Sequence, residues 1–249
     1  MARVKITETV LRDGHQSIAA TRMRLRQMLP VLEAMDEVAI MPWNVGAGAT
    51  FGYVYALPRR RPVGTPADHQ EARQEDALAD VVPRPEYLSY RHYADDVVYE
   101  FVNRASITVS TSSASSTPST TRATWNRPSR RRKTRSPSTS RRLVYTISPI
   151  HTMESFTKVA KELQDMGVDS ICIKDMSGLL SPYDAYNLIR MLKKHLSVPI
   201  ELHTHCTCGL GEMTYMKAIE AGVDIIDTAL SPFGEITSQP ATESMVMAS

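Results

Sequence analysis

Apolar and polar positions follow two alternating periods along the second half of the chain. Short apolar runs predict strands at residues 143–149, 170–176, 199–205 and 223–231. Between them, apolar residues recur at helical spacing and predict helices over residues 155–168, 181–196 and 211–222. Strands that alternate with helices of this length indicate right-handed βαβ units and a parallel sheet.

The first 38 residues show the same order. Residues 4–11 (VKITETVL) are rich in β-branched side chains and predict a strand that ends at Arg12-Asp13-Gly14. Residues 23–38 carry apolar side chains at helical spacing, and Pro30 is expected to bend that helix. The predicted fold class is therefore α/β, a (β/α)8 TIM barrel with its active site at the carboxyl ends of the strands.

The pattern fails between these two halves. Residues 56–86 are rich in Pro and Arg without sustained periodicity, and residues 110–142 contain no Val, Ile, Leu, Met or Phe. Such segments bury too little apolar area to offset an ordering entropy of ~1–2 kcal/mol per residue for the backbone. We therefore expect an incomplete barrel, disrupted and disordered in the region of strands 2–4.

Composition excludes several classes of protein. Hydrophobic residues make up 42% and charged residues 22% of the 249 positions, as in ordinary soluble domains, and a net charge of +2 argues against a general polyanion binder. Three cysteines form no disulfide framework, which favours a cytoplasmic location. We expect no signal peptide, and no run approaches the ~18 apolar residues of a membrane span.

Candidate ligands stand at three predicted strand ends. They are Asp13 in LRDGHQS, Lys174 in ICIKDMSG, and His203 with His205 in ELHTHCTCG. Alternate residues of a strand project to one side, so the two imidazoles are able to hold one divalent ion, with Asp13 as an oxygen ligand. A lysine ammonium cannot ligate a metal, so Lys174 would do so only as a carbamate.

Each of these signals also fits an ordinary structural role. The two histidines are compatible with a polar strand end, Lys174 with an ion pair, and Asp13 with a helix cap. His15 and Gln16 suit either substrate hydrogen bonding or a plain loop. Cys206 and Cys208 lack the second cysteine pair that a zinc knuckle requires.

Longer motifs resemble the carboxyltransferase domain of biotin-dependent enzymes. The likeness is nearest to the oxaloacetate decarboxylase alpha subunit, with pyruvate carboxylase and the transcarboxylase carboxyltransferase subunit as relatives. The stretches that carry it are TETVLRDGHQSIAATRMR, SYRHYADDVVYEFV, YTISPIHTMESF, DSICIKDMSGLLSPYDAY, LHTHCTCG, AIEAGVDIIDTALSPF and TSQPATESMV.

This resemblance implies a metal-assisted transfer of the carboxyl group between oxaloacetate or pyruvate and biotin. The implied metal is Zn, alternatively Mn or Co, and the implied ligands are Asp13, carbamylated Lys174, His203 and His205, with Lys174 also catalytic. Gln16 matches a substrate-contacting glutamine, and we place His15 beside it. The family's proton-shuttling threonine belongs to a later segment, so Thr237 is not assigned that role.

The resemblance also implies partners. Biotin comes from a separate biotinyl carrier domain or subunit, the small-molecule partners are oxaloacetate and pyruvate, and intact relatives are homo-oligomers. Decarboxylase members dock on membrane subunits, so the cytoplasmic chain would be membrane-associated only through them. No nucleic-acid partner is expected.

The family's motifs for strands 2–4 reappear in another reading frame. With codons chosen freely, residues 110–125 read from the third base give DVFRVFDALNDARNLE. Similar slips at residues 40–48 and 77–87 give HALECWGG and HLQMLFRGQN, each between in-frame anchors. We infer that the frame slips and recovers, so the serine-arginine stretch was not selected to bind RNA.

These inferences give one carboxyltransferase-like domain over residues 1–249. Its expected parts are an intact first strand and helix (1–38), out-of-frame segments (39–86 and 104–142), and intact strands 5–8 (143–249), with the last helix cut short and no biotinyl domain. Since a barrel closes only when all strands pair, we expect this literal chain to be inactive.

Two alternatives stay open at this point. One is an aldolase-type lyase or synthase of the same metal barrel superfamily, such as hydroxymethylglutaryl-CoA lyase or isopropylmalate synthase. The other is a basic nucleic-acid-binding protein that uses the arginines of residues 122–142.

Overall fold

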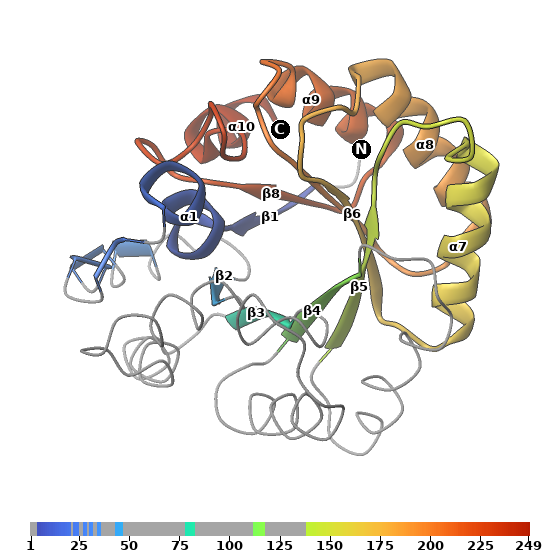
Figure 1. Ribbon diagram of the computed structural model, residues 1–249, viewed down its shortest axis with the longest axis horizontal. Coiled ribbons are helices and arrows are strands. Elements are labelled where there is room, and N and C mark those ends of the chain that lie inside the picture. The colour runs from blue at the N-terminus through green and yellow to red at the C-terminus, as the bar shows by residue number, and fades with distance from the viewer. Residues whose placement is uncertain are drawn as a thin grey trace.

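The fold is an eight-stranded parallel barrel. The computed structural model describes residues 4–20, 22–24, 27–28, 30–31, 34–35, 43–46, 78–82, 112–117 and 138–249. The strands pair in chain order and the ring is closed by β8 against β1 (Figure 1). They are β1 Lys5–Glu8, β2 Trp43–Gly46, β3 Leu78–Val82, β4 Ser112–Thr117, β5 Ser138–Val144, β6 Ser170–Asp175, β7 Ile200–Thr204 and β8 Ile225–Thr228. The predicted α/β barrel is confirmed.

Helices cover the outside of the second half of the ring (Figure 1). They are α7 Met153–Asp165, α8 Pro182–His195, α9 Gly211–Ala221 and α10 Thr242–Ala248. Near the N-terminus lie the π-helix η1 Val10–Gly14 and the short helix α1 His15–Ala19. Within the predicted helix 23–38, the residues 27–28, 30–31 and 34–35 are helical. No helix in the described ranges is long and apolar enough to cross a membrane.

Backbone pairing continues through parts of the region where we expected a disrupted barrel. Residues 43–46, 78–82 and 112–117 pair in parallel as β2, β3 and β4, and β5 already begins at Ser138. Strand pairing uses main-chain N–H and C=O groups, which a serine-rich segment supplies as well as an apolar one. The shortest strand pairing is between β1 and β2, where Glu8 and Trp43 form the one register pair. The other residues of 39–86 and 104–142 lie outside the described part.

The first strand is also shorter than predicted. β1 ends at Glu8, and the amides of Arg12, Asp13 and Gly14 all donate to the carbonyl of Thr9, at 2.9, 2.8 and 3.1 Å. The β-branched run therefore turns into a tight π-helical coil instead of continuing as a strand. This coil brings Asp13 back over the end of the barrel.

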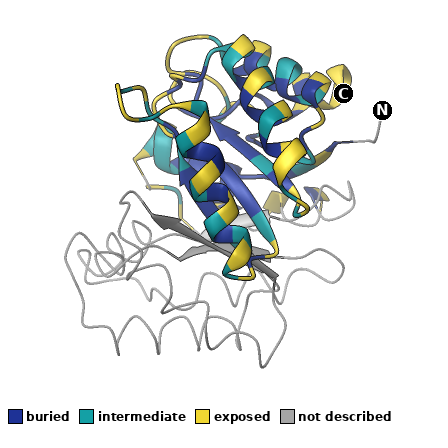
Figure 2. Ribbon diagram, turned by 90° about the vertical axis from the view of Figure 1, so that its right-hand side faces the viewer, coloured by how far each residue is buried: buried dark blue, intermediate teal, exposed yellow. Residues whose placement is uncertain are grey.

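The main core lies between the strands and the outer helices. Ile171 and Ile173 of β6 are fully buried and belong to one cluster with Leu163 of α7 and Leu188 and Leu192 of α8. Figure 2 shows buried residues on the strands and on the inward faces of these helices. Alternation along β6 leaves the intervening residues facing the inside of the barrel.

Local signals set the ends of these helices. Thr152 and Ser181 cap α7 and α8, because their side chains accept hydrogen bonds from the amides of Ser155 and Asp184. Pro182 occupies the first turn of α8, as the sequence predicted. Gly222 ends α9 with a positive φ of 94°, a conformation that glycine adopts without strain.

A buried carboxylate joins the two ends of the described fold. Glu8 Oε1 accepts hydrogen bonds from the amides of Val10 and Leu230, at 2.9 and 3.1 Å, and Oε2 accepts one from the Thr242 hydroxyl at 2.6 Å. Burial raises the pKa of Glu8 to about 7, against the opposing effect of these hydrogen bonds. The contacts link β1 with the segment after β8 and with α10.

We expect Glu8→Ala to lower the free energy of unfolding by ~1–3 kcal/mol, because it leaves buried amides without an acceptor. Glu8→Gln keeps an acceptor and removes the titration. The folded-state pKa lies above 4.5, so the contribution of Glu8 is complete below about pH 4.5 and is lost as pH rises through about 7. Glu8→Gln will therefore gain stability relative to wild type between about pH 5 and 8, measured by urea unfolding. Parallel pH profiles for the two proteins would contradict this account.

Candidate metal centre

The carboxyl ends of three strands meet at one side of the barrel. Lys174 is the penultimate residue of β6 and pairs in register with His203, the penultimate residue of β7. His205 follows β7, and Asp13 lies in η1 directly after β1. Closure of the ring therefore brings residues from opposite ends of the chain into one cluster.

The four side chains predicted as ligands converge on one carboxylate oxygen. Asp13 Oδ2 lies 3.2 Å from Lys174 Nζ, 3.1 Å from His203 Nε2 and 3.8 Å from His205 Nε2. The two Nε2 atoms are 3.2 Å apart, and Lys174 Nζ lies 2.8 Å from His203 Nε2. All four residues are buried. Their ligand roles stay a prediction, but their proximity is a property of the fold.

Both imidazoles are fixed from behind. His203 Nδ1 lies 2.7 Å from Asp227 Oδ2, and His205 Nδ1 lies 2.6 Å from the carbonyl oxygen of Thr237. A backbone carbonyl oxygen only accepts, so His205 Nδ1 carries the proton and His205 Nε2 presents a lone pair to the cluster, as in metal-binding histidines. His203 has a carboxyl oxygen on each side of its ring, Asp227 Oδ2 at Nδ1 and Asp13 Oδ2 at Nε2.

The electrostatics keep these groups in states that bind a cation. Burial lowers the pKa of His203 and His205, and the nearby Lys174 charge adds to it. Burial opposes ionisation of Asp13, but Arg12 and Lys174 outweigh it and hold the pKa of Asp13 well below its usual range. An anionic carboxylate and two neutral imidazoles therefore face one another at neutral pH.

Lys174 is the unusual member of the cluster. Burial lowers its pKa to about 8, against the attraction of Asp13, and the Arg12 and Arg142 charges lower it further. A tenth or so of such amines is uncharged at neutral pH, far more than for an exposed lysine. The buried position of Lys174 thus favours its uncharged form more than an exposed position would.

The predicted substrate residues lie beside the cluster. His15 is buried in the first turn of α1, directly after η1. Gln16 is half-buried, and its Oε1 is enclosed without a hydrogen-bond partner in the described part of the chain. Ser17 donates to Asp13 Oδ1 at 2.9 Å, so α1 and the carboxylate are held together.

The cysteine pair stands apart from this cluster. Cys206 Sγ lies 3.6 Å from Glu212 Oε1, and Cys208 Sγ contacts the carbonyl of Gly178. The two thiols therefore face different partners. The sequence argument against a zinc knuckle is consistent with these contacts.

Sequence reasoning missed two residues of the site. Asp227 orients His203, and Gln239 places Nε2 3.2 Å from the Nε2 atoms of both histidines. A signal existed for Asp227, since it interrupts the apolar strand VDIIDTAL near its carboxyl end. Gln239 stood in the quoted motif TSQPATES without a role.

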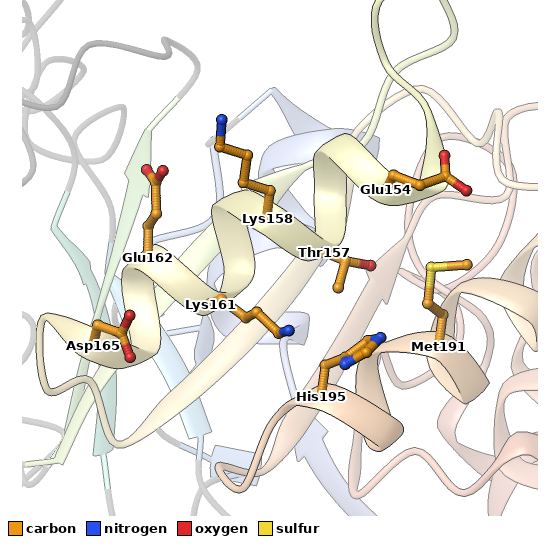
Figure 3. Close-up of a pocket in the computed structure, with 8 residues that line it drawn as sticks. All are labelled: Glu154, Thr157, Lys158, Lys161, Glu162, Asp165, Met191 and His195. Atoms are coloured by element: carbon orange, nitrogen blue, oxygen red, sulfur yellow. The ribbon is translucent and has the colours of Figure 1, made fainter.

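A groove on the outside of the barrel is separate from this centre. It lies between α7 and α8, as Figure 3 shows. Its lining residues are Glu154, Thr157, Lys158, Lys161, Glu162, Asp165, Met191 and His195. The metal cluster lies at the strand ends inside the ring, so this groove is not the candidate site.

Three of the four predicted ligands lie within a recognised family match. The HMGL-like family matches residues 140–249, which contain Lys174, His203 and His205. A pyruvate carboxylase subunit of Methanocaldococcus jannaschii is 41% identical over 98% of this chain and 43% of its own length. The methylmalonyl-CoA carboxyltransferase 5S subunit of Propionibacterium freudenreichii is 35% identical over 97% of this chain and 48% of its own.

A solved structure agrees with these relatives. The carboxyl transferase domain of Rhizobium etli pyruvate carboxylase with pyruvate and biocytin has a TM-score of 0.94 and 29% identity, and the match covers 99% of this chain and 43% of that one. The chain thus spans less than half the length of the relatives described.

We expect both site histidines to be neutral at neutral pH in the metal-free protein, with the proton of His205 on Nδ1. The folded-state pKa of each lies below 6.5, so folding opposes their protonation as pH falls. Imidazole ¹H–¹⁵N spectra of a chelator-treated sample report tautomer and charge directly. An Nε2–H signal from His205 would refute the proposed orientation of its lone pair.

Proposed function

Because the chain is homologous to the carboxyltransferase domains of pyruvate carboxylases, we propose that its barrel carries the metal centre of a biotin-dependent carboxyltransferase. The reaction moves a carboxyl group between biotin and the methyl carbon of pyruvate, with oxaloacetate as the carboxylated 2-oxo acid. The observation that carries this proposal is the convergence of Asp13, Lys174, His203 and His205 at the strand ends. The biocytin and pyruvate of the Rhizobium etli domain support the substrate class.

The donor set fits a divalent transition metal. One carboxylate oxygen, two imidazole nitrogens and a carbamate oxygen suit Zn, with Mn or Co as alternatives. When bound, such an ion polarises the keto oxygen of the substrate and stabilises negative charge on it. Asp13, His203 and His205 already lie with one ligand atom each within 4.8 Å of one another.

Lys174 enters the donor set through its chemistry. Its uncharged amine attacks carbon dioxide, an N–C bond forms, and the amine gives up one proton, which leaves a carbamate with an anionic oxygen. The lowered pKa, about 8, favours this step at neutral pH. The product replaces a cation by an anion next to Asp13, which a divalent metal then compensates.

Other residues orient this centre and the substrate. Asp227 and the Thr237 carbonyl hold the two imidazoles, and Ser17 holds Asp13. We assign Gln16 and His15 to substrate binding, since they follow Asp13 on α1 and the Gln16 oxygen has no partner among the residues that the structure describes. Biotin arrives on a carrier domain or subunit, and we place the protein in the cytoplasm as a homo-oligomer that meets membrane subunits only as partners.

The strands β2, β3 and β4 coincide with the places where we infer that the reading frame of the gene slips. β2, β3 and β4 lie at residues 43–46, 78–82 and 112–117, each inside a stretch where another frame restores a family motif. The HMGL-like match begins at residue 140, three residues before position 143, where we place the return of the literal frame. The resemblance assigns substrate binding to the arginine of the RGQN motif, which the literal chain lacks. We propose that the gene encodes a complete barrel and that the literal chain holds metal without turnover.

The alternative lyase or synthase function rests on the HMGL-like match, which concerns the metal barrel. The two relatives above match nearly the whole chain and are components of a carboxylase and of a carboxyltransferase, which favours carboxyl transfer. An acyl-CoA cleavage assay on the frame-restored protein separates the two. The nucleic-acid alternative rests on residues 122–142, of which residues 122–137 lie outside the described part. Arg141 and Arg142 belong to β5 and are buried.

We expect the chelator-treated chain to bind one Zn²⁺ or Mn²⁺, measured by calorimetry in bicarbonate buffer. His205→Gln will weaken binding at least about 10–100-fold, the loss that follows even from changes to partners of metal ligands. His195→Gln is the matched control, since His195 is exposed at the end of α8 on the outside of the barrel. Equal affinities for the two variants, or no binding by the wild type, would remove the metal centre from the proposal.

Sequencing the gene tests the frame. We expect the codons under residues 40–48, 77–87 and 110–125 to encode the family motifs in a second frame. A protein built with that frame restored and with the family's later threonine segment appended will decarboxylate oxaloacetate in the presence of biotin, whereas the literal chain with the same segment will not. Codons that hide no such motif would overturn this part of the proposal.

A further inference from the structure

Gln239 bridges the candidate metal centre and a threonine behind it. The residue is fully buried in the segment between β8 and α10. Its amide nitrogen lies 3.2 Å from His203 Nε2 and 3.2 Å from His205 Nε2. Its amide oxygen lies 2.7 Å from Thr9 Oγ1. One side chain therefore contacts both imidazoles and the turn at the end of β1.

In this orientation the amide occupies a lone pair that a metal needs. His205 carries its proton on Nδ1, because the Thr237 carbonyl accepts from it, so its Nε2 accepts a hydrogen bond from Gln239. The amide nitrogen also faces His203 Nε2, which Lys174 Nζ and Asp13 Oδ2 approach at 2.8 and 3.1 Å. A divalent cation at the centre would compete directly with the Gln239 donor.

The Thr9 hydroxyl has one proton for two acceptors. Its Oγ1 lies 2.8 Å from the carbonyl oxygen of Thr228 and 2.7 Å from Gln239 Oε1. It donates to one of them, so the other contact brings two oxygens together without a proton. If the amide is turned end for end, Thr9 donates to Thr228 and accepts from Gln239 Nε2, and both contacts become hydrogen bonds.

We propose that the Gln239 amide turns with occupancy of the metal centre, a proposal that rests on the metal centre proposed above. In the metal-free protein an N–H group of the amide donates to His205 Nε2. With a divalent cation bound, Oε1 faces the cation as a further oxygen donor and Thr9 changes from donor to acceptor. An amide oxygen is attracted to a dication, whereas an N–H group is repelled by it.

This assignment makes Gln239 a determinant of metal preference. Carbonyl oxygens suit Mn²⁺, whereas imidazole nitrogens suit Zn²⁺. Loss of the amide oxygen should therefore weaken Mn²⁺ binding more than Zn²⁺ binding.

The decisive variant is Gln239→Met, which keeps the length of the side chain and removes both ends of the amide. If Oε1 faces the cation, Mn²⁺ affinity in calorimetry falls by roughly 10–100-fold, with a smaller loss for Zn²⁺. If the amide only donates to the imidazoles, its removal frees their lone pairs, and affinity stays equal or rises. That result overturns the inference.

Thr9 gives a second, independent variant pair. Thr9→Val removes the acceptor for the turned amide and should weaken Mn²⁺ binding, and Thr9→Ser should restore it. Gln164→Met is the control for the Gln-to-Met change, because Gln164 accepts hydrogen bonds from Ser197 and Val198 away from the centre. Circular dichroism shows whether each variant folds.

The wild-type protein provides a readout that needs no variant. Side-chain ¹⁵N spectra should show the Gln239 amide protons near the histidine rings without metal and near Thr9 after Zn²⁺ is added. Unchanged contacts on Zn²⁺ binding overturn the inference and leave the metal centre intact. A wild type that binds neither ion removes both.

Discussion

The buried contact between Asp13 and Lys174 depends on the closure of the barrel. These residues lie 161 positions apart, and their side chains meet at 3.2 Å because β8 pairs with β1 and closes the ring. Both groups lie away from water, where an unpaired charge is strongly unfavourable. The carboxylate therefore requires cationic neighbours, and Lys174, Arg12 and the imidazole nitrogens lie around it. A divalent cation satisfies the same requirement.

Residues outside the proposed ligand set hold the candidate metal centre in position. The Thr237 carbonyl sets the tautomer of His205, Asp227 holds His203 through Nδ1, and Glu8 links the start of the chain to α10. Rigid support of this kind keeps ligand atoms within the small displacements that metal binding tolerates. The segment between β8 and α10 supplies several of these contacts, so the last described elements matter to the centre as much as the first.

The sequence predicted the parts of the fold that depend on side-chain pattern. The helices at 155–168, 181–196 and 211–222 appear within a few residues, because caps and apolar spacing define them. Strand alternation likewise placed His203 and His205 on one side. The strands at 43–46, 78–82 and 112–117 were not predicted, since their surroundings lack the sustained apolar pattern that marked the other strands, and main-chain pairing does not require it. Gln239 escaped because its role depends on contacts with residues far along the chain.

The two halves of the chain are also coupled through charge. Arg142 of β5 pairs in register with Cys172, and residues paired in a parallel sheet point to the same side, so its guanidinium faces the barrel interior beneath Lys174. Its charge contributes to the lowered pKa of Lys174. Residue 142 is the last position of the segment that we assign to a slipped frame. A restored frame would therefore change the charge beneath Lys174 while it leaves the four proposed ligands in place. The pKa of Lys174 thus depends on residues of β5 as well as on its immediate neighbours.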